Sequence, residues 1–133
     1  MNWRHPATFI PAIVVMVGMF VVSDEPRPSQ SITIEVGPLL YHLTAFGFLA
    51  ALIVLPLLGA GYKPIVAIAA GLLTSAGYGV FDEYHQSFVP YRSVSELDVA
   101  LDTIAAFMGA LVTCTIFWLG ENKSVKRIRE VDN

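Results

Sequence analysis

Long apolar runs alternate with short polar segments along the whole chain. No Asp, Glu, Lys or Arg occurs inside residues 6–22, 36–62, 64–81 or 103–120. A helix needs roughly 20 apolar residues to cross a bilayer core about 30 Å thick. The pattern therefore predicts four membrane-spanning helices within one domain of residues 1–133, at about residues 6–23, 38–60, 64–82 and 98–120.

The composition supports an all-α, polytopic membrane protein. Hydrophobic residues make up 55% of the chain and charged residues only 14%, against about 25% charged residues in soluble domains. A soluble helical domain would also need a polar face on each helix. The single cysteine, Cys114, lies inside the fourth run and excludes an intrachain disulfide.

The basic residues predict the orientation, because Lys and Arg concentrate on the cytoplasmic side of membrane proteins. With both termini cytoplasmic, the outer segments hold only Arg27 and Arg92. The six basic residues on the cytoplasmic side would then be Arg4, Lys63, Lys123, Lys126, Arg127 and Arg129. The acidic, proline-bearing segment 23–37 is then an exposed outer linker. As an alternative, Arg4 and the first run loosely resemble a cleavable secretory signal.

Polar residues gather at the predicted outer ends of three helices. In the third helix a stripe of small residues, one every fourth position from Ala67 to Gly79, leads to Asp82. Such stripes allow close helix packing in membranes, so we expect the third and fourth helices to pack together. His42 in the second helix lies at a similar depth. The polar residues at this level are His42, Asp82, Glu83, His85, Gln86, Arg92, Asp98 and Asp102.

The residue types in this cluster allow structural and functional interpretations. Structurally, Arg92 bridges the acids, and Ser95 caps the fourth helix in an arrangement close to a capping box with Asp98. Functionally, an arginine among carboxylates suits a phosphate- or carboxylate-bearing ligand. A third interpretation is hydrolysis with Glu83 as general base and a metal on Asp82 and His85. No zinc signature such as H-E-x-x-H occurs, so we expect no metal and no cofactor, and no surface suggests nucleic-acid binding.

Residues 81–98, "FDEYHQSFVPYRSVSELD", resemble the signature of the VanZ-like membrane proteins, roughly D-E-x-x-Q-x-F-x-P-x-R followed by D. The segment "HLTAFGFL", which contains His42 and Phe46, is similar to the second helix of that family. The sequence departs from the family in having Tyr91 before the motif arginine, where many members have glycine. Four spans in about 130 residues also fit.

The resemblance implies a multi-pass protein of the bacterial cell membrane with a cell-envelope role, because the family takes its name from a teicoplanin-resistance protein. We expect an outward-facing polar site that binds a lipid-linked or amphiphilic ligand and lowers glycopeptide sensitivity. The partners would be membrane lipids, a lipid-linked cell-wall precursor or a lipoglycopeptide. The predicted ligand-binding residues are His42, Asp82, Glu83, Gln86, Arg92, Asp98 and Asp102.

Two alternatives remain open at this point. The protein could be a small membrane hydrolase or transferase that acts on lipid headgroups or cell-wall precursors, with Glu83 as the candidate catalytic residue. It could instead be a structural partner of another membrane protein, in a homo- or hetero-oligomer, with the small-residue stripes as docking faces. Whether the protein is an enzyme is therefore undecided by the sequence.

Overall fold

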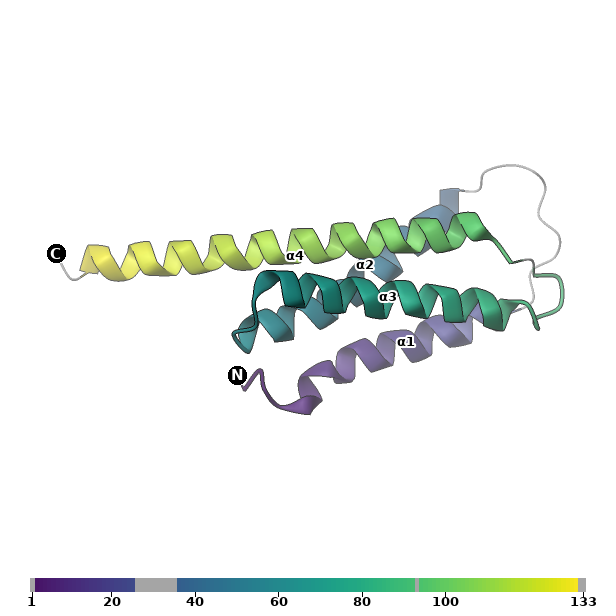
Figure 1. Cartoon of the computed structure of the whole chain (residues 1–133), viewed down its shortest axis with the longest axis horizontal. Helices are drawn as coiled ribbons and strands as arrows, with labels where there is room; N and C mark the ends of the chain where they lie inside the picture. Colours follow the sequence, from purple (N-terminus) through teal and green to yellow (C-terminus); the bar gives the residue numbers. More distant parts are fainter. Residues whose placement is uncertain (1, 26–35, 93, 132–133) are drawn as a thin grey trace.

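The computed structural model describes residues 2–25, 36–92 and 94–131 and consists of helices that run side by side (Figure 1). A short 3-10 helix, Pro6–Phe9, leads into α1 (Ile10–Ser23). It is followed by α2 (Val36–Gly59), α3 (Pro64–Gln86) and α4 (Glu96–Val131). The described residues contain four spans long and apolar enough to cross a membrane, which confirms the predicted all-α class. Most of the predicted outer linker, residues 23–37, lies outside the described residues.

Two predicted helix boundaries are wrong, and the first of them bears on the polar cluster. The third helix does not end at residue 82 but continues to Gln86, so the acidic motif is helical. The fourth helix begins at Glu96 and reaches Val131 instead of residue 120. At about 1.5 Å per residue, its 36 residues exceed the thickness of a bilayer core. The charged tail continues the helix because Glu, Lys and Arg are good helix formers.

The core of the molecule lies between α2, α3 and α4. Phe46, Leu49 and Val54 of α2 are fully buried there. The small residues of α3 face this core, as their spacing predicts, since Ala67 and Ser75 are also fully buried. The outer surface is apolar instead of polar, with Leu73 of α3, for example, 72% exposed. This inverted pattern suits helices surrounded by lipid.

Helices α2 and α4 approach each other closely at two glycines. A Cβ atom built on Gly109 would lie 2.1 Å from the carbonyl oxygen of Gly47. Gly109 of α4 therefore packs against α2. Ala105 also packs on α2, because its carbonyl oxygen lies 3.2 Å from a Cβ built on Gly47. Gly47 stands between Phe46 and Phe48 and was not predicted as a packing position.

The contact between α3 and α4 is confirmed, at Gly79. A Cβ atom there would lie 2.9 Å from Oδ2 of Asp102. Gly71, lower in the stripe, contacts Ala50 and Val54 of α2. The small residues of the α3 stripe thus pack against α2 and α4 within the chain.

The arrangement of the helices separates charge of opposite sign. Arg4, Lys63 and Lys123 belong to the end of the bundle that holds the N-terminus and the α2–α3 turn (Figure 1). The acidic ends of α3 and α4 lie at the opposite end. The positive-inside rule therefore still predicts that the acidic end faces outward.

Candidate functional site

The centre of the site is a buried pair between α2 and α4. Nδ1 of His42 lies 2.8 Å from Oδ1 of Asp102, within hydrogen-bonding distance. Asp102 is 1% exposed and His42 is 8% exposed. The His42 ring stacks over Phe46, one turn further along α2, with 6.0 Å between ring centroids. Because acids at membrane depth require partners, the pair explains how α4 tolerates Asp102.

The last turns of α3 place Asp82 and Gln86 in the same buried layer. Nε2 of Gln86 donates a hydrogen bond to Oδ2 of Asp82 at 2.7 Å, between residues one helical turn apart. Both side chains are 4% exposed. The small stripe that ends at Gly79 brings α3 close to α4, so this pair approaches Asp102.

Glu83 fastens the start of α4 to the end of α3. Its Oε2 accepts a hydrogen bond from the backbone N–H of Ser95 at 2.7 Å, although Glu83 is only 3% exposed. Ser95 caps α4 as predicted, because its Oγ accepts from the backbone N–H of Asp98 at 3.2 Å. In a capping box the side chain of Asp98 would accept a hydrogen bond from the backbone N–H of Ser95. Here Glu83, which belongs to α3, accepts that hydrogen bond instead.

Each of the three buried acids keeps one oxygen without a donor. Among the described residues, Oδ1 of Asp82, Oε1 of Glu83 and Oδ2 of Asp102 have no hydrogen-bond partner. A buried polar atom without a partner costs about 1–3 kcal/mol, and more when it is charged. The site is therefore rich in acceptors and suits a group that donates hydrogen bonds or carries positive charge.

The loop between α3 and α4 forms the rim of the site. Tyr91 has a positive φ of 64°, a left-handed conformation that a residue other than glycine seldom adopts. Its exposure is 79%, so the conformation is not imposed by burial of its ring. The backbone N–H of Arg92 donates to the carbonyl of Val89 at 3.2 Å. Arg92 and Asp98 are half-buried, at the edge of the buried acids.

His85, which was predicted as part of the cluster, faces another direction. Nε2 of His85 lies 3.2 Å from Oδ1 of Asp24 after α1, and its ring lies 4.3 Å from that of Phe20. The proposed metal pair of Asp82 and His85 therefore has no support in the geometry. Within residues 2–25, 36–92 and 94–131 no group of three His, Cys, Asp or Glu side chains is arranged to hold a metal ion.

Two residues of the site were predicted only as packing residues. Gly79 was predicted as part of a packing stripe, whereas it also forms the wall behind the Asp102 carboxylate. Ser75, one turn deeper, is fully buried and its Oγ has no partner among the described residues. Serine is about as small as the alanines and glycines around it, so Ser75 was interpreted as a packing residue. Its hydroxyl at a lipid-depth position was the one sign of a polar role.

Comparison with known proteins identifies a family for this chain. No curated protein and no solved structure matches the chain. The sequence matches the VanZ/LLP1 family over residues 3–118, a range that contains the first three spans, most of the fourth and every residue of the site. The match agrees with the motif of residues 82–98 and with the position of His42. The chain is therefore a multi-pass membrane protein that belongs to the VanZ/LLP1 family.

Proposed function

We propose that this protein acts in the bacterial cell envelope and binds the polar head of an amphiphilic ligand at the acidic ends of α2, α3 and α4. The observation that carries the proposal is the set of unpartnered oxygens on Asp82, Glu83 and Asp102. Three acids that are each at most 4% exposed carry a desolvation cost that a role in packing alone does not explain. A ligand that donates hydrogen bonds to them would offset that cost.

The site favours a ligand with donors at one end and an apolar tail. Amine, hydroxyl and amide groups match the free carboxylate oxygens, and Arg92 at the rim suits a carboxylate or phosphate of the same ligand. Around the rim Tyr84, Phe88 and Leu97 are between 65% and 69% exposed, a surface that an acyl chain would cover. A lipid-linked cell-wall precursor and a lipoglycopeptide both have this two-part chemistry.

The proposed orientation places the site on the outer face of the membrane. Arg4, Lys63 and Lys123 at the other end of the bundle favour the cytoplasmic side. Glycopeptide antibiotics act outside the membrane, so an outward site could contact either the antibiotic or the precursor to which it binds. Lowered teicoplanin sensitivity is the expected consequence.

The proposal is tested by teicoplanin susceptibility in a sensitive Gram-positive host that expresses the wild type, Glu83→Gln or Arg92→Lys at matched membrane abundance. Glu83→Gln is nearly isosteric, and its amide oxygen still accepts the Ser95 N–H. Glu96→Gln is the matched control, because Glu96 is an exposed acid at the start of α4. We expect protection by the wild type and the control, and none by the other two. Equal protection by all four proteins would mean that the acids have only a structural role. Absence of protection by the wild type would exclude the resistance role.

A second candidate function is hydrolysis or group transfer at a headgroup, and the pairing of His42 with Asp102 favours it. A carboxylate that orients a histidine is a common arrangement for general acid–base catalysis. The pair would accept a proton from water or a hydroxyl, while Glu83 remains an alternative base. Incubation of the purified protein with labelled lipid-linked precursor distinguishes the two functions. Release of the headgroup that His42→Gln abolishes supports catalysis, and an unchanged, bound precursor excludes it.

A further inference from the structure

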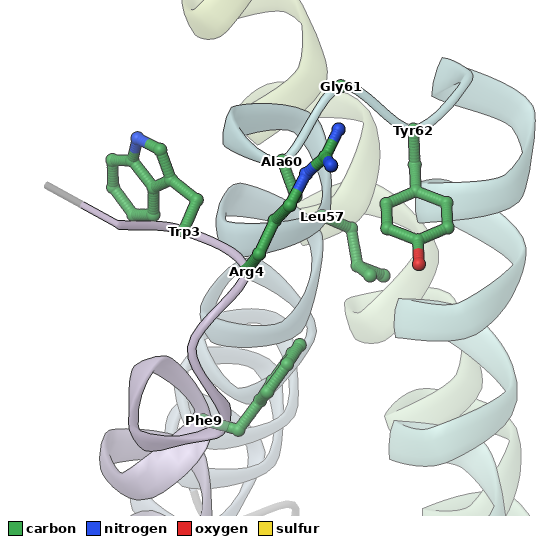
Figure 2. A pocket seen from close by; sticks show the side chains of 7 residues that line it. All are labelled: Trp3, Arg4, Phe9, Leu57, Ala60, Gly61 and Tyr62. Atoms are coloured by element: carbon green, nitrogen blue, oxygen red, sulfur yellow. The ribbon is translucent and has the colours of Figure 1, made fainter.

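A pocket lies at the opposite end of the bundle, far from the acidic site. It measures about 430 Å³ and is lined by Trp3, Arg4, Phe9, Leu57, Ala60, Gly61 and Tyr62. Figure 2 shows the Arg4 side chain extending toward the α2–α3 turn at Gly61, between Trp3 and Tyr62. The pocket therefore combines one cation with an aromatic and aliphatic wall.

The N-terminal segment folds back to form this pocket. Nδ1 of His5 accepts a hydrogen bond from the backbone N–H of Ala7 at 3.2 Å, and the Thr8 hydroxyl donates to the carbonyls of His5 and Trp3. The Trp3 ring packs directly on Gly59, where a Cβ atom would lie 2.5 Å from Cδ2 of the ring. These contacts hold Arg4 beside the end of α2.

The charge in the pocket has no ion-pair partner among the described residues. Arg4 is exposed, and it forms no ion pair with any other described residue. No acidic residue lines the pocket. Lys63 follows Tyr62 directly and adds a second positive charge nearby. An anion is therefore the complementary occupant, and a guanidinium binds phosphate through two parallel hydrogen bonds.

The position of the pocket indicates a lipid instead of a soluble anion. It lies where the spans Pro6–Ser23 and Leu39–Gly59 meet the membrane boundary. Phe9 and Leu57 line its apolar side, and Ile10 and Ile13 beyond Phe9 are 54% and 57% exposed. An acyl chain can lie along this surface while the phosphate stays at Arg4. Trp and Tyr are also the residues typical of headgroup depth.

We propose that this pocket binds an anionic phospholipid, with its phosphate on the Arg4 guanidinium and an acyl chain against Phe9 and Leu57. An anionic headgroup is preferred over a zwitterionic one because no carboxylate in the pocket would receive a choline or ethanolamine cation. One basic residue near a membrane surface contributes about 1 kcal/mol to anionic lipid binding, which corresponds to a preference of about fivefold.

The two tryptophans of the chain allow a direct measurement. Trp3 lines the proposed pocket, whereas Trp118 lies on α4 beside Glu121, in a neighbouring pocket at the same end. Trp118→Phe leaves Trp3 as the only tryptophan, and Trp3→Phe leaves Trp118. Each protein is placed in bilayers that contain phosphatidylglycerol or phosphatidylcholine with brominated acyl chains. Fluorescence quenching then gives the relative binding constant of the two lipids at each tryptophan.

We expect about a fivefold preference for phosphatidylglycerol at Trp3 and no preference at Trp118. Arg4→Gln should abolish the preference at Trp3, and Arg4→Lys should keep part of it, because lysine retains the charge without the two-pronged geometry. Lys123→Gln removes a charge at the same end but outside the pocket, so it should have no effect. Equal binding of both lipids at Trp3, or a preference that survives Arg4→Gln, would overturn the proposal.

Discussion

The contact between Gly47 and Gly109 makes the sharpest prediction about stability. Gly109→Ala should destabilise the protein strongly, because the added Cβ would lie 2.1 Å from the Gly47 carbonyl oxygen and 2.7 Å from its Cα. Both atoms belong to the backbone, so no rotation of a side chain can relieve the overlap. The helices α2 and α4 must move apart by about 1 Å to reach ordinary contact.

The magnitude follows from two opposing effects. Overpacking of a tight interior costs about 1–3 kcal/mol, and a contact between two backbones belongs at the upper end of that range. Alanine in a helix is favoured over glycine by about 1 kcal/mol, which offsets part of the loss. The expected net loss in the free energy of unfolding is therefore about 2 kcal/mol. Because Asp102 precedes Gly109 by two turns of α4, the shift should also loosen its contact with His42.

The assay is thermal unfolding in one detergent, followed by the loss of helical circular dichroism. Gly120→Ala is the control, because nothing lies within 4 Å of a Cβ atom built there. Gly47→Ala should be intermediate, since its Cβ would meet the Ala105 carbonyl at 3.2 Å. We expect a midpoint lowered by several degrees for Gly109→Ala and unchanged or raised for Gly120→Ala. Equal midpoints for these two variants would refute the close approach of α2 and α4.

Three further predictions concern the site and its rim. Glu83→Ala should lower the free energy of unfolding by about 1.5–3 kcal/mol relative to Glu83→Gln, as measured by chemical denaturation in detergent, because only Gln can still accept the Ser95 N–H; equal stabilities would contradict the cap. His42→Ala should cost about 3–5 kcal/mol by leaving Asp102 buried and alone, and the double variant with Asp102→Ala should recover part of that loss in a thermodynamic cycle; simple additivity would exclude the pairing. Tyr91→Gly should be more stable than Tyr91→Ala by about 1 kcal/mol in thermal unfolding, because only glycine lacks a Cβ that strains a positive φ; a more stable alanine variant would contradict the left-handed turn.

The sequence predicted the number of helices and the polar layer because both depend on local composition. Uninterrupted apolar runs identify spans, and acids that follow a stripe of small residues identify an inward face. The length of α3 was underestimated because the first charged residues, Asp82 and Glu83, were taken as the end of the span. In the structure those acids turn inward and are buried, so the membrane does not require the helix to stop there.

The partners of the site residues could not be predicted, because they depend on the rotation of each helix. Gln86 and His85 are adjacent in the sequence, yet Gln86 faces the acids and His85 faces α1. Glu83 and Ser95 are twelve positions apart across a loop, and residue types alone equally allowed Asp98 as the cap partner. Tyr91 stands where the resemblance predicts a glycine, and its φ of 64° lies in a region that glycine adopts without strain.

Direct binding by the purified protein tests the central claim most closely. Teicoplanin is titrated into the wild type, Glu83→Gln and Glu96→Gln in nanodiscs, and the heat of binding is recorded. The account predicts saturable binding by the wild type and by Glu96→Gln. It also predicts binding at least about tenfold weaker for Glu83→Gln, since a hydrogen bond to a buried charge contributes about 1.5–3 kcal/mol. Absence of binding by the wild type, or equal affinity for Glu83→Gln, would contradict the assignment of the acidic cluster as the binding site for this amphiphile.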